Sequence, residues 1–267
     1  MHTKPISVFQ PKKDNPMSAT LPQTQDLAER LLRQDLAAAF RLLDRYGMSD
    51  LTNGSVVARL PGETDWFLTH PHGLFFHEVK ATDLIRVGMN GEALDHPDTP
   101  TNFAVCRPAA SIFKTRPDVN AIIHAHGMGI MSVAALADGL LPCLTEAAIP
   151  FYEDVGYIEG DFFFEPDYCD EIAVKLGTHK ALIYRHHAFA TVGASVAEAF
   201  FYAYSLNVAC DLQMKILASN RDYVVPSKEQ CVRHYQAAFG GDWKSDGSVE
   251  WPGLRRMLDQ QDSSYID

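Results

Sequence analysis

The segment Ala121-Ile122-Ile123-His124-Ala125-His126 most constrains how this chain can fold. Its apolar run follows a turn-like Arg-Pro-Asp and predicts a buried strand in an α/β sheet. Successive strand side chains point to opposite faces, so His124 and His126 point the same way, about 7 Å apart. Such a pair can bind a metal ion, or it can be two hydrogen-bonded core histidines. A metal site would need a third ligand.

A second pair of histidines follows another apolar run. Ala181 to Tyr184 predicts a strand that leads into Arg185-His186-His187. Neighbouring residues on a strand face opposite sides, so at most one of His186 and His187 can join the first pair. The other would orient a ligand or pack.

Chain length and composition are typical of an ordinary globular protein. With 267 residues, 46% hydrophobic and 21% charged, the chain can form one domain or at most two. Residues 1–25 contain four prolines among polar residues and no signal-peptide core, which predicts a flexible N-terminal arm. Residues 26–267 are expected to form a single domain. No apolar run reaches the length of a membrane helix.

The net charge argues against two kinds of partner, and the cysteine spacing indicates the redox compartment. The formal net charge is -11 and there is no basic cluster, which argues against nucleic acid and anionic membranes. Five cysteines lie without C-x-x-C spacing, a pattern that suits a reducing compartment. We therefore expect a cytoplasmic protein.

The spacing of apolar residues predicts alternating helices and strands. Helices are expected at 26–46, 102–114, 128–137, 167–176, 195–216 and 228–239, and strands at 56–60, 66–68, 84–89, 121–126 and 181–184. Pro108 inside the second helix indicates a kink or a late start. The histidine-rich segment 69–76 predicts either a tight loop with exposed imidazoles or the wall of a pocket.

Several motifs together resemble the class II aldolase/adducin family. They are Thr115-Arg116-Pro117-Asp118 before the His-x-His strand, Arg185-His186-His187-Ala188 with Thr191-Val192-Gly193, the segment 67–76, and Trp251-Pro252. The last two are in the manner of the adducin-head-like branch, and the resemblance runs from about Leu27 to Leu258. It implies a three-layer α/β/α domain with a central, mainly antiparallel sheet, assembled as a homotetramer with active sites between subunits.

The resemblance also implies a ligand set. His124, His126 and His187 match the three metal ligands of the family, and His186 takes an outward position that supports them. Sugar-phosphate aldolases of the family carry a glutamate acid–base in the helix before the His-x-His strand, where this chain has Val105. Their phosphate-binding serines fall at Phe103 and Ala104, so a phosphorylated sugar is not the expected substrate.

Glutamate-less members of the family include iron-dependent oxygenases, and three neutral imidazoles leave open positions on Fe²⁺. The resemblance thus implies an Fe²⁺-dependent dioxygenase that uses O2 and a small 2-oximino or 2-oxo acid. An aldolase or decarboxylase with Zn²⁺ or Mn²⁺, acting on a non-phosphorylated 2-oxo acid, is the first alternative. A non-catalytic, adducin-like assembly module is the second.

Residues around the metal can be assigned expected roles. An apolar wall that keeps water out, and a set of polar contacts to the substrate, would complete the site. The expected wall is Phe75, Phe103 and Val105, and the expected substrate contacts are Ser55, His72, Gly73 and Asn102.

Overall fold

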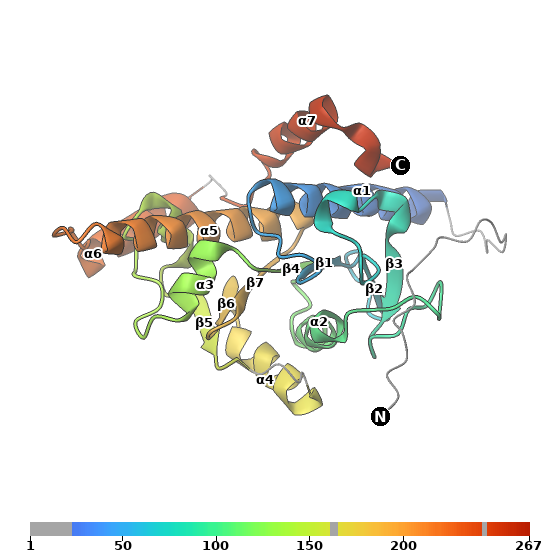
Figure 1. Cartoon of the computed structure of the whole chain (residues 1–267), viewed down its shortest axis with the longest axis horizontal. Helices are drawn as coiled ribbons and strands as arrows, with labels where there is room; N and C mark the ends of the chain where they lie inside the picture. The colour runs from blue at the N-terminus through green and yellow to red at the C-terminus, as the bar shows by residue number, and fades with distance from the viewer. Residues whose placement is uncertain (1–22, 161–164, 242–244) are drawn as a thin grey trace.

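The computed structural model describes residues 23–160, 165–241 and 245–267, which build a three-layer α/β/α domain (Figure 1). Its seven-stranded sheet has the order β3-β2-β1-β4-β7-β6-β5. Neighbouring strands are antiparallel except β5 and β6, which are parallel. The strands are β1 (Ser55–Ala58), β2 (Trp66–Thr69), β3 (Ile85–Gly88), β4 (Ala121–Ala125), β5 (Val155–Ile158), β6 (Ala181–Tyr184) and β7 (Ala188–Gly193). The predicted fold class is confirmed.

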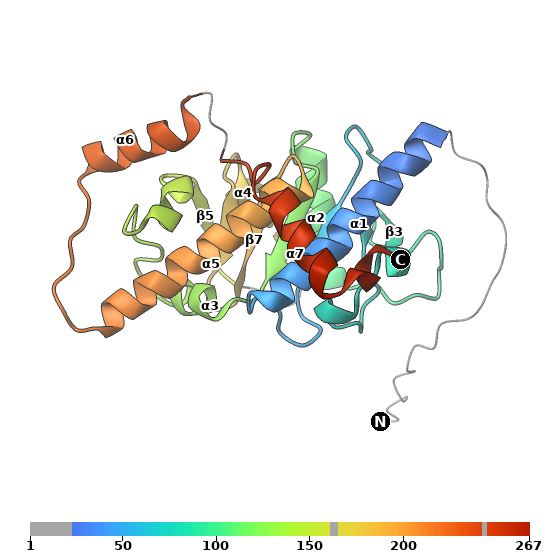
Figure 2. The same cartoon turned by 90° about the horizontal axis from the view of Figure 1, so that it is seen from above.

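Helices cover both faces of this sheet. The α-helices are α1 (Gln23–Arg45), α2 (Phe103–Thr115), α3 (Met128–Ala134), α4 (Pro166–Leu176), α5 (Val196–Ala218), α6 (Lys228–Phe239) and α7 (Trp251–Gln261). Short 3₁₀ helices are η1 (Phe76–Glu78), η2 (Ala81–Asp83), η3 (Glu146–Phe151) and η4 (Ser263–Ile266). Figure 1 shows α1 and α5 along one face and α2 and α4 on the other, and Figure 2 shows α7 crossing outside α1 and α5.

Strand β4 lies at the centre of the sheet because both of its faces are apolar. Ile123 packs in the core under α1 and α5, whereas Ile122 packs in the core under α2 and α4. Burying both branched side chains stabilises the strand by roughly 1.5–3 kcal/mol each. The same alternation places His124 on the side of α2 and α4, at the end of the strand.

Local contacts fix the turn that leads into β4. The Arg116 guanidinium is paired with Asp118 at 2.7 Å and donates to the carbonyl oxygen of Gly177 at 2.6 Å. Buried Arg59, next to β1, donates to the carbonyl oxygens of Arg116 and Val119. The turn therefore serves to hold the strand that carries the histidines.

The structure corrects several predicted elements. Helix α2 begins directly after its cap Asn102 and includes Pro108, so the late start is wrong. Helix α3 ends three residues before the predicted Ala137. Strands β5 and β7 were not predicted. Of the predicted arm, residues 1–22 lie outside the described residues, and 23–25 already belong to α1. Among the described residues, no helix is both long and apolar enough to cross a membrane.

Candidate metal centre

Three histidines from two connected parts of the sheet meet at one point. His124 is the next-to-last residue of β4, His126 lies two residues further along the chain, and His187 lies in the turn between β6 and β7. One side-chain nitrogen from each lies within 4.8 Å of the others. The pairing of β4 with β7, in which Ala125 lies opposite Phe189, brings the turn beside the His-x-His segment. The two separate histidine motifs thus converge at one point, and their role as metal ligands stays a prediction.

Hydrogen bonds orient two of the rings. The Nδ1 atom of His124 lies 2.9 Å from the carbonyl oxygen of Phe189, and that of His126 lies 3.1 Å from the Oδ2 atom of Asp50. Both partners are acceptors, so each neutral ring carries its hydrogen on Nδ1 and presents a bare Nε2. Neither contact could be predicted from the sequence, because no motif links the loop at residue 50 to His126 or the backbone of β7 to His124.

The remaining nitrogens fit a metal ion. The Nε2 atoms of His124 and His126 are 3.4 Å apart. With both hydrogens on Nδ1, this distance separates two lone pairs and is not a hydrogen bond. Two imidazole nitrogens at about 2.0–2.1 Å from a tetrahedral ion would lie roughly 3.4 Å apart. The spacing therefore suits a shared cation, which would also relieve the repulsion of the lone pairs.

The turn at residues 185–187 directs the side chains of His186 and His187 to different environments. His186 has φ +59°, its side chain is exposed, and its amide donates to the carbonyl oxygen of Ala134. His187 faces the cluster, with its ring centroid 5.1 Å from that of His126. His186 and His187 thus point in different directions, as expected. The expectation that they are neighbours on a strand is wrong, because both lie in a turn in which His186 adopts the left-handed conformation.

Burial and the neighbouring imidazoles lower the pKa of His124 and of His187. Desolvation, followed by the neighbouring His126 and His187, holds the pKa of His124 well below 6.5. Desolvation and then His126 lower the pKa of His187 to about 4. The hydrogen bond from His126, and then that from Asn53, lowers the pKa of the Asp50 carboxyl. At neutral pH His124 and His187 therefore offer uncharged nitrogen donors, and the Asp50 carboxylate lies behind His126.

Removing the Asp50 carboxylate is expected to weaken metal binding. In Asp50→Ala, His126 loses the acceptor that orients its ring, and we expect a loss of about 10–100-fold in affinity for Zn²⁺. Asp50→Asn keeps an acceptor and should lose less. Competition with a chromophoric chelator measures the dissociation constant for Zn²⁺ of each variant and of the wild type. An unchanged affinity in Asp50→Ala would show that the contact does not support the site.

An apolar wall stands beside His124. A cavity of about 10 Å³ lies between α2 and the sheet and is bordered by Val105, His124 and Tyr184. The ring of buried Tyr184 lies 5.3 Å from that of His124. Phe75 and Phe103, expected in the same wall, do not line this cavity, and their exposed fractions are 39% and 52%. Their predicted role is thus not supported within a single chain.

The expected substrate contacts lie in two different environments. Ser55 is buried opposite His124, and its hydroxyl lies 2.7 Å from that of Thr69. Asn102 caps α2, its side-chain oxygen accepting from the amide of Ala104. His72 and Gly73 are exposed in the loop after β2. Their roles toward a substrate stay predictions.

His70 completes a buried polar chain behind Ser55. Its Nδ1 atom lies 3.3 Å from the Ser55 hydroxyl, and Thr69 donates to the carbonyl oxygen of Val56. The ring packs 4.5 Å from that of Phe40. Complete burial, and then nearby His72, lower the pKa of His70 to about 3.

This buried imidazole predicts a loss of stability in acid. The folded pKa is depressed below 6.5, so below pH 6.5 only the unfolded chain takes up the proton. The free energy of unfolding should fall by about 1.4 kcal/mol per pH unit for this group as pH drops from about 6.5 toward 3. Urea unfolding of metal-free protein at pH 7.5 and pH 5 should show a smaller difference for His70→Asn than for the wild type. The exposed His72→Asn is the matched control, and an equal pH dependence in wild type and His70→Asn would contradict the assignment.

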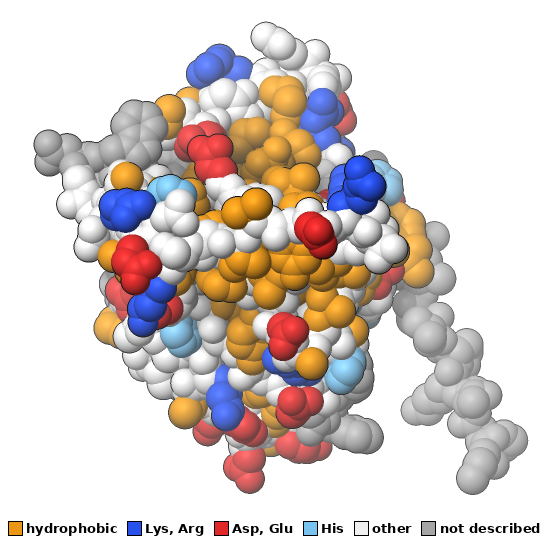
Figure 3. All heavy atoms as spheres, turned by 90° about the vertical axis from the view of Figure 1, so that its left-hand side faces the viewer, with side chains coloured by type: hydrophobic (Ala, Val, Ile, Leu, Met, Phe, Trp, Pro, Cys, Tyr) orange, Lys and Arg blue, Asp and Glu red, His pale blue; other side chains and the backbone are white. Residues whose placement is uncertain are grey.

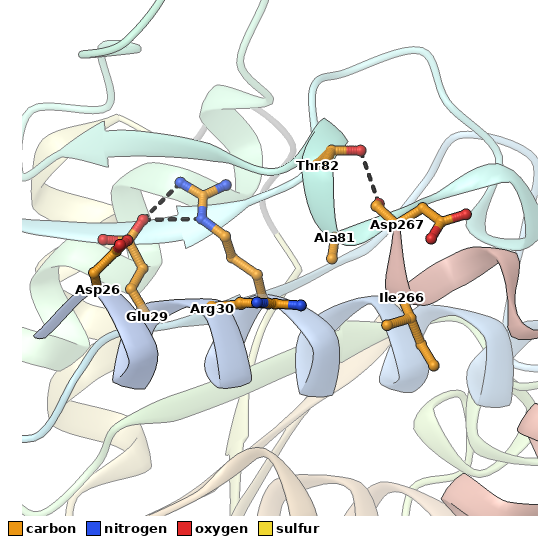
Figure 4. A pocket seen from close by; sticks show the side chains of 8 residues that line it. Asp26, Glu29, Arg30, Ala81, Thr82, Ile266 and Asp267 are labelled. Carbon is orange, nitrogen blue, oxygen red and sulfur yellow. Dashed lines mark hydrogen bonds and ion pairs between the residues drawn. The ribbon is translucent and has the colours of Figure 1, made fainter. Parts of the chain in front are cut away.

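A hollow larger than the cavity beside His124 lies elsewhere in the described part of the chain. It measures about 510 Å³ and is formed by α1, η2 and the C-terminus (Figure 4). Polar residues that line this hollow are paired with each other. Glu29 forms an ion pair with Arg33 at 2.7 Å, and the Thr82 hydroxyl donates to the backbone oxygen of Asp267 at 2.8 Å. No residue of the histidine cluster borders it.

A three-layer α/β/α domain with three histidines converging at its central strand defines a protein of the class II aldolase type. The family model for the "Class II Aldolase and Adducin N-terminal domain" matches residues 34–214. The chain belongs to this class II aldolase/adducin family.

Similar proteins include aldolases and adducins by name. A candidate aldolase class 2 protein of Caulobacter vibrioides is 30% identical over 90% of this chain and 93% of its own length. Mouse alpha-adducin is 34% identical over 88% of this chain, which spans 34% of that protein. The structure of L-fuculose 1-phosphate aldolase from Glaciozyma antarctica superposes with a TM-score of 0.79 at 25% identity, covering 94% of this chain and 96% of that one.

Proposed function

We propose that this protein is an Fe²⁺-dependent dioxygenase of a small 2-oximino or 2-oxo acid. Its candidate reaction converts pyruvic oxime and O2 into pyruvate and nitrite, and the atoms balance without a further reductant. One observation carries the proposal. Val105 is 7% exposed and borders the same cavity as His124, and by the family resemblance it corresponds to the position at which sugar-phosphate aldolases carry their acid–base glutamate.

The residues present suit an ion that needs neutral ligands. Among the described residues, the candidate metal-binding group contains only His124, His126 and His187 and no carboxylate. Bound Fe²⁺ would supply redox chemistry and open positions for a chelating acid. Asp50 and the Phe189 carbonyl would hold two ligand rings in place, as orienting groups do at other metal sites.

The surroundings of His124 fit a reaction without proton abstraction by the protein. A valine cannot accept a proton, and the α2 wall next to it is apolar. Such a wall excludes water from the reacting groups. An oxime acid that is oxidised directly needs no carboxylate base at this position.

An oxygen-uptake experiment tests the proposal. Protein purified without oxygen, stripped of metal and reloaded with Fe²⁺ should consume O2 with pyruvic oxime and release nitrite in equal amounts. Protein reloaded with Zn²⁺ is the matched control and should consume none. Absence of O2 uptake by the iron-loaded protein would refute the proposed reaction.

A second candidate is an aldolase or decarboxylase that uses Zn²⁺ or Mn²⁺. The similarity to an L-fuculose 1-phosphate aldolase favours it. It predicts turnover of a 2-oxo acid without oxygen by the zinc-loaded protein. The match to alpha-adducin favours a non-catalytic assembly module, which predicts that neither metal supports turnover.

We further propose that the chain forms a homo-oligomer, with a tetramer as the family expectation. Hydrophobic side chains gather on the face that holds α6 and the end of α5 (Figure 3). Leu212 on α5 and Val224 in the following loop have exposed fractions of 37% and 86%. Sedimentation of wild type and Val224→Asp tests whether this face contributes, and a monomeric wild type would contradict the proposal.

A further inference from the structure

Helix α3 connects the two parts of the histidine cluster. Its cap Gly127 directly follows His126, so the helix begins next to one candidate ligand. Seven residues at 1.5 Å each make α3 about 10 Å long. Its last residue, Ala134, accepts a hydrogen bond from the amide of His186, the neighbour of His187. The helix thus runs from one candidate ligand to the turn that holds another.

The side chain of Arg185 completes the attachment at the C-terminal end of α3. Its guanidinium donates to the carbonyl oxygens of Leu136 and Ala137, which follow the last turn of the helix. Carbonyl groups at a helix C-terminus lack partners within the helix, and a cation placed there also meets the negative end of the helix dipole. Arg185 therefore holds this end of α3 against the turn at residues 185–187.

Arg185 is itself fixed on the sheet. Its amide donates to the carbonyl oxygen of Ile158 on β5 at 2.8 Å, and its Cζ atom lies 4.6 Å from the centre of the Tyr157 ring. The Tyr157 hydroxyl accepts from the amide of Leu140 at 2.9 Å, so the same ring also holds the segment after α3. A half-buried guanidinium with these partners keeps one position.

Close packing against α5 prevents α3 from moving sideways. A Cβ added at Gly129 would lie 2.6 Å from the backbone nitrogen of Asp211 on α5. A Cβ added at Gly127 would lie 2.1 Å from the side-chain oxygen of Asn207 on the same helix. Protein interiors packed this closely transmit a displacement instead of absorbing it. A change at the C-terminal end of α3 should therefore reach His126.

We propose that Arg185 is a positioning residue of the candidate metal centre. It acts through α3 and the turn at residues 185–187, and it sets how far His187 lies from His126, whose ring centroids are 5.1 Å apart. The inference rests on the proposed role of the histidines as metal ligands, but not on the reaction that the metal supports. An arginine suits the position because its planar fork binds two carbonyl oxygens at once, whereas a lysine presents a single point charge.

The affinity for zinc in two graded variants tests this role. Arg185→Met removes both carbonyl contacts and should raise the dissociation constant for Zn²⁺ by about tenfold, an effect typical of groups that orient metal ligands. Arg185→Lys keeps the charge and one donor, and should raise the constant by about threefold. If Arg185→Met does not fold, Arg185→Lys alone decides. A dissociation constant equal to that of the wild type in the folded variants would overturn the proposal.

A matched arginine and a cobalt spectrum distinguish positioning from general stability. Arg41 donates to the carbonyl oxygens of Glu78 and Val79 at the end of η1, a helix that carries none of the three clustered histidines. Arg41→Met should lose stability but no affinity for zinc. The visible absorption of bound Co²⁺ depends on its ligand geometry and should change in Arg185→Met only. An equal loss of zinc affinity in Arg41→Met, or identical cobalt spectra in all variants, would overturn the proposal.

The role of Arg185 and the proposed reaction can fail separately. A weaker affinity for zinc in Arg185→Met, together with no oxygen uptake by iron-loaded wild type, would retain the role and refute the reaction. Oxygen uptake by the wild type, together with an unchanged affinity for zinc in Arg185→Met, would retain the reaction and overturn the role. A wild type that binds no Zn²⁺ would overturn the role as well.

Discussion

His124→Ala is expected to lose its bound metal almost completely. The substitution removes one of three nitrogen donors and also the ring that closes the gap to His126. Loss of one ligand of three should weaken binding by at least about 1,000-fold, or roughly 4 kcal/mol. Metal analysis after dialysis against a weak chelator should find about one equivalent per chain in the wild type and none in the variant.

The exposed neighbour of His187 provides the matched control. His186→Ala alters the same turn, but its side chain points to solvent and no hydrogen bond of the cluster depends on it. It should keep its full metal content. If His124→Ala retained metal, or if His186→Ala lost it as well, the assignment of ligands would be wrong.

Gly54→Ala is expected to destabilise the whole domain. Gly54 has φ +88°, and an added Cβ would lie 2.7 Å from the carbonyl oxygen of His124 and 3.2 Å from the ring of Phe76. Backbone strain and the clash together should cost roughly 2–4 kcal/mol in the free energy of unfolding. Neither contact can yield cheaply, because one belongs to β4 and the other to a fully buried ring.

Substitution of a second glycine with positive φ distinguishes the cost of backbone strain from the cost of the steric clash. Gly47 ends α1 at φ +68° with no heavy atom within 4 Å of an added Cβ. Gly47→Ala should therefore cost only the conformational part, about 1 kcal/mol. Urea unfolding measures both variants. Equal losses would show that the approach of Gly54 to β4 is not tight.

The convergence of the three histidines could be predicted because their pattern is local. Period-two alternation places His124 and His126 on one side of a strand, and the family motifs supply His187 as the third ligand. Apolar runs and caps predicted most of the helices and strands, whereas the three-layer fold class was implied by the family resemblance. Each of these inferences needs only residues a few positions apart, or a motif known from elsewhere.

The groups that orient the ligands could not be predicted. Asp50 is 76 residues before His126 and lies in a turn-rich loop with no distinctive motif. The Phe189 carbonyl belongs to β7, a strand that was not recognised. Both contacts depend on the register of neighbouring strands and on how α1 ends, which are properties of the assembled sheet.

The wall role expected of Phe75 and Phe103 stays a prediction. Their apolar character and their place in family motifs predicted a wall at the metal. In the structure they lie at the surface, while Val105, only two positions from Phe103, faces the sheet. Helical periodicity explains the difference, because residues two apart on a helix do not face the same way.

Isotope labelling tests the central claim most directly. Iron-loaded protein that turns over pyruvic oxime under ¹⁸O2 should release nitrite in which one oxygen is labelled and the other comes from the oxime. The same reaction under ordinary O2 in ¹⁸O-labelled water, analysed before exchange, should give unlabelled nitrite. Nitrite labelled only from water, or turnover that continues without oxygen, would contradict an oxygenase built on His124, His126 and His187.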